Sequence, residues 1–254
     1  MPNLGQIISV VGPLVEVCLL WRLTREEMRA RYRFLFTYVL YCFLGMDVTL
    51  FAIRHVAENI YVRTYWDLEL VSLFLRFLVI WEIYRQTFGN TAGPRRTWPL
   101  GWGGVGLCLG LVAVCGFTWL LAYRSFHSIL LSLECTVGIA QAVLVLGALF
   151  GAKLSGIAMG RNMWGVAVGL GAYVSIGVLN YALSDVNGFM MRLLRVVAPS
   201  SFVGMVLVWT WALWNYVPNP QTDPARQKLP SEAAAWWARQ WERSRDEVRK
   251  VVNP

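Results

Sequence analysis

Residues 65–88 read YWDLELVSLFLRFLVIWEIYRQTF, and this stretch decides the fold. It is long enough to cross roughly 30 Å of hydrocarbon as an α-helix, and its centre is almost continuously apolar. Yet it also carries four charged residues, which are Asp67, Glu69, Arg76 and Glu82. Charges at membrane depth are costly, so each of them needs a partner or a function there.

The composition of the whole chain points the same way. It is 57% hydrophobic and 15% charged, with a mean hydropathy of +0.49, whereas soluble domains carry about 25% charged residues. Seven apolar runs are long enough to span a bilayer, at about residues 4–23, 34–53, 65–88, 100–123, 129–150, 163–183 and 197–217. We therefore predict an all-α membrane protein with a seven-transmembrane-helix bundle over residues 1–217.

Two soluble segments are predicted after the bundle. Residues 218–230 form a proline-rich linker, and residues 231–254 form an amphipathic cytoplasmic helix. The helix is expected either to lie on the inner leaflet or to dock a partner protein, and both alternatives stay open. Its membrane-interface or docking residues are Trp236, Trp237, Trp241, Arg239 and Arg243.

The distribution of Lys and Arg predicts the orientation. Seventeen of these residues fall on one side of the seven spans, five fall on the other, and Arg76 lies within a span. The positive-inside rule then puts the N-terminus outside and the C-terminus in the cytoplasm. The net charge of +8 is assigned to this topology, and no nucleic-acid partner is predicted because no basic stripe with interleaved aromatic residues is present.

Counting about 1.5 Å per residue along each helix estimates the depth of the polar residues. Arg76 falls near the bilayer midplane, and the others fall towards the outer side; these are Asp47, Glu69, Glu134 and Asn180. We predict that the five residues line an outward-facing cavity that binds a small ligand or ion, or passes protons. The alternative is a structural polar network that holds the helices together.

Glu69 and Arg76 share one face of the predicted helix, two turns or roughly 10 Å apart. This separation predicts that they do not form a direct ion pair, and that Arg76 is paired from another helix by Asp47 or Glu134. The polar contacts expected on the inner side are Glu82, which points away from Arg76, and Glu16.

Two glycine pairs predict close helix packing. Gly106 and Gly110 form one GxxxG pattern, and Gly165 and Gly169 form another. Small residues at this spacing allow two membrane helices to approach closely.

Motifs of membrane enzymes and pigments are absent from the sequence. No HExxH, GxSG or Walker motif occurs, and the last predicted span lacks the lysine that a retinal protein needs. A single haem between His55 and His127 at the outer surface is geometrically possible, but no cofactor, metal site or catalytic residue is predicted.

Two segments resemble a known group of proteins. YWDLELVSLFLRFLVIWEIYRQTF and WGVAVGLGAYVSIGVL resemble the patterns YW…E…F.VIYEIF and GIALG.G…S of small stand-alone seven-transmembrane bacterial proteins of unknown function, common in Acidobacteria. The shared positions include Glu69 and Glu82 but not Arg76. The resemblance implies the seven-helix fold and brings no activity with it.

The predicted function is non-enzymatic. We expect a multi-pass protein of the bacterial cytoplasmic membrane that acts as a sensor-like or accessory subunit with a protein partner or as an oligomer. Similar seven-helix layouts form the input modules of some bacterial sensor kinases, but no kinase domain follows in this sequence. The alternative is a small-solute carrier or proton-coupled channel that uses the outward-facing cavity.

Overall fold

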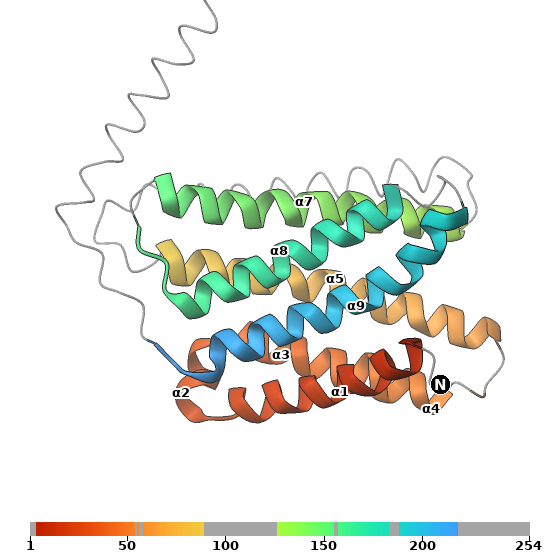
Figure 1. Cartoon of the computed structure of the whole chain (residues 1–254), viewed down its shortest axis with the longest axis horizontal. Helices are drawn as coiled ribbons and strands as arrows, with labels where there is room; N and C mark the ends of the chain where they lie inside the picture. The colour runs from red at the N-terminus through yellow and green to blue at the C-terminus, as the bar shows by residue number, and fades with distance from the viewer. Residues whose placement is uncertain are drawn as a thin grey trace, which may run out of the picture.

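The computed structural model describes residues 4–53, 55, 58–88, 126–154, 157–182 and 188–217, and in this part of the chain it is helical with no strand. The elements are α1 (Leu4–Leu23), α2 (Glu26–Arg31), α3 (Arg33–Tyr41), the π-helix η1 (Cys42–Val48), α4 (Thr49–Ile53), α5 (Glu58–Phe88), α7 (Phe126–Leu154), α8 (Arg161–Ala182) and α9 (Gly188–Trp214). The long helices lie side by side in a bundle (Figure 1). The prediction of an all-α protein is confirmed.

Three helical stretches are long and apolar enough to cross a membrane. They are Arg33–Ile53, Leu133–Lys153 and Arg161–Asn180, and a shorter apolar helix covers Pro199–Trp214. Helix α5 is long enough as well, but its charges lower its mean hydropathy. The described helices are therefore typical of a membrane protein.

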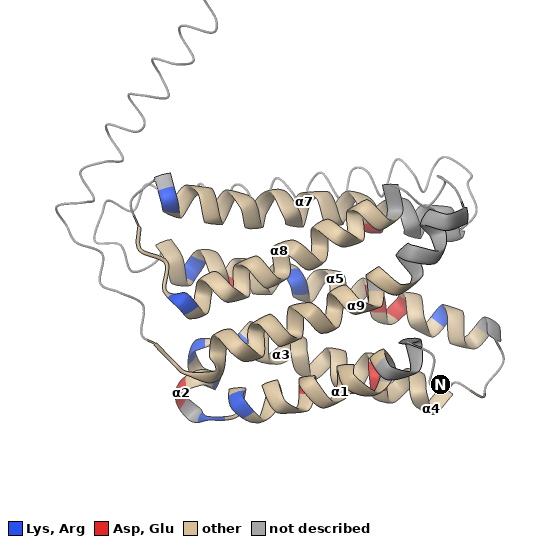
Figure 2. Cartoon of the chain, in the orientation of Figure 1, with Lys and Arg blue, Asp and Glu red and all other residues tan. Residues whose placement is uncertain are grey.

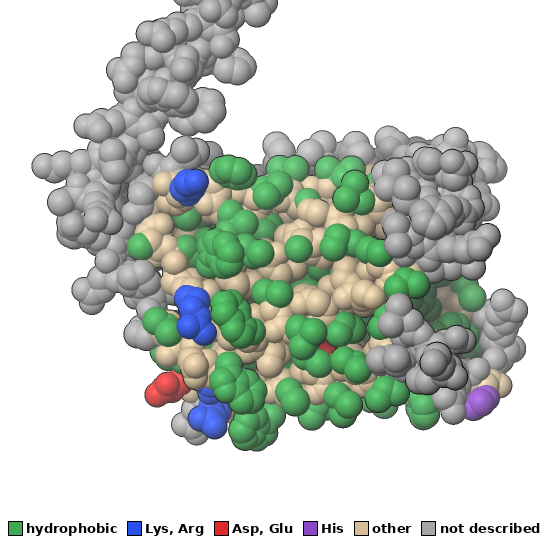
Figure 3. Space-filling view, viewed as in Figure 1, with side chains coloured by type: hydrophobic (Ala, Val, Ile, Leu, Met, Phe, Trp, Pro, Cys, Tyr) green, Lys and Arg blue, Asp and Glu red, His purple; other side chains and the backbone are tan. Residues whose placement is uncertain are grey.

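The surface of the bundle is apolar where a soluble protein would be polar. Leu14, Phe74, Val143 and Trp211 are each more than half exposed, and hydrophobic side chains cover much of the face seen in Figure 3. Several polar side chains are buried instead: Glu16, Glu69, Ser72, Arg76, Glu82, Gln86, Thr87, Gln141 and Asn162. This inside-out distribution suits a bundle surrounded by lipid.

Apart from Arg63 and Arg76 of α5, the described basic side chains gather at one end of the bundle (Figure 2). This basic end, as we call it, consists of Arg22, Arg25, Arg29, Arg31, Arg33, Arg85, Lys153 and Arg161. Aromatic rings cover several of these cations: Arg25 lies over Trp21, with 5.5 Å from Cζ to the ring centroid, and Arg161 lies over Trp211 at 5.1 Å. Such pairs are common where helices leave a membrane.

Helices α5 and α7 run in the same direction. Near their middles Gln141 of α7 donates a hydrogen bond to the carbonyl oxygen of Leu73, and further along Tyr84 of α5 donates to the carbonyl oxygen of Leu144. Helices α7, α8 and α9 then alternate in direction (Figure 1). Both α5 and α7 therefore begin at the end opposite the basic end.

The helix bounds correct several expectations. Helix α1 has the predicted bounds, whereas α5 begins at Glu58, before residue 65, and α9 begins at Gly188, inside the predicted loop after the sixth span. A short helix, α2, forms in the polar segment between the first two predicted spans. Hydropathy marks only the apolar middle of a helix, so polar turns that continue the helix are missed. The fourth span, its Gly106 and Gly110, the linker 218–230 and the helix 231–254, with Trp236, Trp237, Trp241, Arg239 and Arg243, lie outside the described residues.

The second glycine pair lies where α8 meets α9. A Cβ atom added at Gly165 would lie 2.3 Å from the Cβ of Ala212, and one added at Gly169 would lie 2.8 Å from Nε1 of Trp209. Trp209 is completely buried, and its Nε1 donates a 3.0 Å hydrogen bond to the carbonyl oxygen of Val166. The predicted close approach at Gly165 and Gly169 is confirmed, and it makes room for the tryptophan.

Gly165→Ala should destabilise the bundle. The added methyl group overlaps Ala212, and overpacking of this kind costs about 1–3 kcal/mol. The free energy of unfolding in detergent would measure the effect. Gly204→Ala on α9 is the matched control, because a Cβ there meets nothing within 4 Å. Equal stability of the two variants would contradict this account of the packing.

Candidate functional site

A cavity of about 370 Å³ lies inside the bundle, between its middle and the end opposite the basic end. We call it the central cavity. Residues of α3, η1, α4, α5, α7, α8 and α9 line it, whereas the described lining includes none of α1 or α2. All five residues predicted to line a cavity do so: Asp47, Glu69, Arg76, Glu134 and Asn180.

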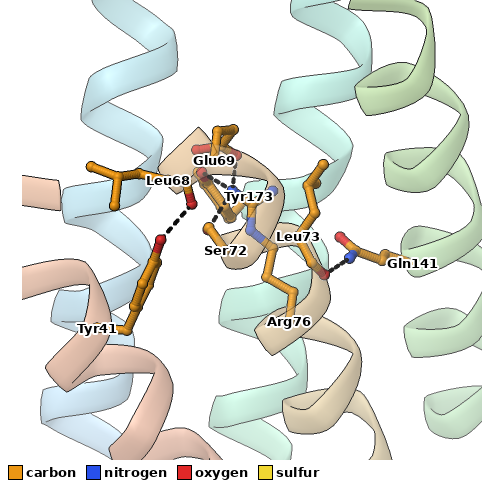
Figure 4. A network of polar contacts seen from close by, with 8 residues as sticks. All are labelled: Tyr41, Leu68, Glu69, Ser72, Leu73, Arg76, Gln141 and Tyr173. Carbon is orange, nitrogen blue, oxygen red and sulfur yellow. Dashed lines mark hydrogen bonds and ion pairs between the residues drawn. The ribbon is translucent and has the colours of Figure 1, made fainter. Parts of the chain in front are cut away.

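Arg76 and Glu69 form a buried ion pair in the wall of this cavity (Figure 4). Nη2 of Arg76 lies 2.5 Å from Oε1 of Glu69, and it also donates to Oγ of Ser72 at 3.2 Å and to the hydroxyl of Tyr173 at 3.1 Å. The guanidinium group also lies over the ring of Tyr173, with 4.9 Å from Cζ to the centroid. Both charged residues are about 95% buried, so the pair is shielded from solvent screening.

The prediction that Glu69 and Arg76 do not pair directly is wrong. Side chains of a helix lean towards its N-terminus, so the long Arg76 side chain extends back along α5 over the two turns that separate it from Glu69. The prediction that Asp47 or Glu134 pairs with Arg76 is also wrong, because the partner comes from its own helix. Tyr173 of α8 is the contact from another helix.

Neutral hydrogen bonds attach α5 to its neighbours next to the ion pair. The hydroxyl of Tyr41 donates to the carbonyl oxygen of Leu68 at 2.7 Å, and Nε2 of Gln141 donates to that of Leu73 at 2.9 Å (Figure 4). These bonds join α3 and α7 to the same two turns of α5. The helix that carries the charges is therefore held from both sides.

Asp47 reaches the cavity from the π-helix η1. In a π-helix the hydrogen bonds join residues five apart, and such segments are frequent at functional sites. Just beyond it Thr49 Oγ1 donates a 3.0 Å bond to the carbonyl oxygen of Leu44, also five residues back. Asp47 is half-buried, and it lines both the central cavity and a second cavity. The second cavity lies between α1, η1, α4, α5 and α9.

Glu82 performs a structural task near the basic end. Its carboxylate accepts hydrogen bonds from the backbone N–H groups of Leu35 at 3.0 Å and Phe34 at 3.4 Å, in the first turn of α3. Tyr32, the residue before α3, makes no capping bond with its own side chain, so α5 supplies the cap that this helix needs. Tyr32 is itself buried, which raises the pKa of its phenol to about 12 and keeps it neutral beside this carboxylate.

Glu16 lies apart from Glu82, although both were expected on the inner side. It is completely buried in α1 and lines the second cavity, where its nearby charge is Asp47. The two acids thus have different surroundings. Glu82 is bonded to backbone, and Glu16 faces a cavity.

Several residues of the central cavity were missed from the sequence. Tyr65, Tyr173, Ser201 and Phe202 all line it. An aromatic residue in an apolar run is usually part of the core, so nothing marked these four individually. Tyr173 does lie seven residues before Asn180, which places both on one face of α8, and that spacing is the signal that could have found it.

The two histidines considered for a single haem are His55 and His127. His55 is exposed after α4, and the side chain of His127 lies outside the described residues. Among the residues that are described, no group of three His, Cys, Asp or Glu side chains could hold a metal ion.

The central cavity suits a small polar molecule that carries positive charge. Three carboxyl groups, those of Asp47, Glu69 and Glu134, line it together with the guanidinium group of Arg76. Acidic groups therefore outnumber basic ones. The rings of Tyr65 and Tyr173 add faces on which a cation can lie.

Arg76→Met alone should lower the free energy of unfolding by about 3–5 kcal/mol, because it leaves the buried Glu69 carboxylate without its partner. The double variant Arg76→Met/Glu69→Leu should lose less than the two single variants together. Urea or thermal unfolding in detergent would measure all three. Asp67→Asn, an exposed acid on the same helix, is the control and should be neutral. Strictly additive losses would show that the two residues act independently.

No protein-family model matches this chain, and no curated protein and no solved structure is significantly similar to it. The resemblance to the acidobacterial membrane proteins therefore stays a prediction. The case for a function rests on the geometry of the cavity.

Proposed function

We propose that this chain is a non-enzymatic, sensor-like or accessory subunit of a membrane, whose central cavity binds a small ammonium-bearing solute. The observation that carries the proposal is the gathering of Asp47, Glu69, Arg76, Glu134 and Asn180 from four separate elements around one cavity. Polar residues that served only to hold helices together would not need to leave such a space.

The proposed topology has seven spans in a bacterial cytoplasmic membrane, with the N-terminus outside. The basic end supports this orientation, because positive charge is retained on the cytoplasmic side. The parallel directions of α5 and α7 support the span count, since the chain between them has to return to the opposite end. In this orientation the central cavity lies towards the outside, where an external solute enters.

A sensor-like subunit changes shape or stability when its ligand binds. The ion pair of Arg76 and Glu69 and the bond to Tyr173 join α5 to α8 beside the cavity. A bound ammonium group would compete for the same carboxylate and so alter the tie between these helices. The signal would then pass to a protein partner or to a second copy of the chain.

A thermal-shift screen of the purified chain against primary amines, amino acids and alkali cations tests the ligand. We expect at least one ammonium compound to raise the apparent Tm, by the linkage between binding and stability. Glu134→Gln should raise the ligand concentration needed for the same Tm shift at least tenfold, because a cavity carboxylate is lost. Asp67→Asn should leave it unchanged. Shifts that are equal in both variants would exclude the central cavity as the binding site.

The runner-up is a carrier or proton-coupled channel, which is favoured by Asp47 lying between two cavities. Purification from native membranes in mild detergent separates the two functions. A sensor-like subunit should co-purify with a partner protein or as an oligomer. A chain that purifies alone as a monomer and moves protons or amines into proteoliposomes would overturn the subunit proposal in favour of the carrier.

A further inference from the structure

A second cavity of about 640 Å³ opens between α1, η1, α4, α5 and α9. Its lining is more apolar than that of the central cavity, and four aromatic side chains take part: Phe43, Phe51, Tyr61 and Phe202. Its volume falls in the range of small-molecule sites, which are apolar with a few placed polar groups. The acids in its lining are Glu16 and Asp47.

Glu16 is the unusual member of this lining. It is 0% exposed, and within the described part of the chain neither carboxylate oxygen has a hydrogen-bond partner. Among the described residues of the lining there is no lysine or arginine, and the neighbouring charge is the acidic Asp47. A buried carboxylate without a cation is costly, so either a proton or a cation that enters the cavity has to neutralise it.

The lining argues against an inorganic ion. Calcium takes six to eight oxygen ligands and magnesium about six, whereas the described side chains here offer two carboxylates and the hydroxyl of Tyr61. Aromatic rings and aliphatic side chains favour an organic cation whose charged centre is surrounded by apolar groups. The apolar groups pack on the walls of the cavity, and the positive charge is attracted to the faces of the aromatic rings.

We propose that this second cavity binds a lipophilic organic monocation, with Glu16 as its counter-ion. The π-helix η1 supports the assignment, since it supplies Phe43, Met46 and Asp47 to the same wall. The site adjoins the solute site of the proposed function, with which it shares Met46, Asp47, Leu50, Pro199 and Phe202, and it differs in the wall that α1 supplies with Glu16. The two cavities share Asp47, so a cation in one should weaken binding of a cation in the other.

Tetraphenylphosphonium is a suitable probe because its charge is permanent and it carries no proton. Equilibrium dialysis of the full chain in nanodiscs should show saturable binding that Glu16→Gln weakens at least tenfold. Glu27→Gln is the matched control: it removes an exposed acid near the basic end, and binding should stay as in the wild type. Phe43→Leu keeps the apolar wall but removes one ring face, and it should weaken binding several-fold even if Glu16→Gln does not fold.

Binding should also weaken as the pH falls, because a protonated carboxyl group cannot act as a counter-ion. The titratable groups that act on Glu16 or share its cavity are Asp47 and Cys42 of η1 and Tyr61 of α5; the described lining from α4 and α9 adds none. Glu16→Asp keeps the charge and should keep the pH dependence, whereas Glu16→Gln should lose most of it.

Three results would overturn the proposal. The first is binding that is equal in the wild type, Glu16→Gln and Phe43→Leu, which would show partition into lipid. The second is binding abolished by Glu134→Gln but not by Glu16→Gln, which would place the probe in the central cavity. The third is proton uptake that depends on Glu16 without any binding of the probe. The thermal-shift screen tests the central cavity through Glu134→Gln, and the dialysis tests the second cavity through Glu16→Gln. Failure of one proposal is therefore distinguishable from failure of the other.

Discussion

The fold depends on one guanidinium group that is buried inside an apolar bundle. Arg76 has little access to water, so its charge has to be compensated by the protein. Glu69, Ser72 and Tyr173 do this from two helices. The ion pair is formed within α5 itself, which means that this helix carries a nearly neutral charge pair into the apolar bundle rather than an isolated cation. Its partners from other helices are then needed for position more than for charge.

Helix α5 is consequently the element around which the others are arranged. Tyr41 of α3 and Gln141 of α7 bond to adjacent turns of its backbone, and Glu82 on its far turn caps the start of α3. Each of these three sets of hydrogen bonds has a backbone group as one partner, and backbone groups are present whatever the neighbouring side chains are. By contrast, the contact between α8 and α9 relies on shape, with Gly165 and Gly169 facing Ala212 and Trp209.

Some of this could be predicted from sequence and some could not. The depth of Asp47, Glu69, Glu134 and Asn180 follows from counting along apolar runs, because a helix rises by a constant amount per residue. The pairing of Glu69 with Arg76 does not follow, since it depends on how a long side chain lies along the axis. The cap supplied by Glu82 requires the start of α3 to be known, and hydropathy does not define it. Glu16 and Asp47 become neighbours only through the packing of α1 on η1.

The π-helix η1 has a consequence for the helix that follows it. Each residue of an α-helix turns by about 100°, so a segment with wider turns shifts the phase of everything after it. Phe36 and Tyr41 lie before this shift, whereas Leu50 and Phe51 lie after it. A helical wheel drawn through 33–53 as one regular helix would assign the later residues to the wrong face. Helix α3 therefore faces the core near the basic end with one side of this stretch, and α4 faces the two cavities with a different side.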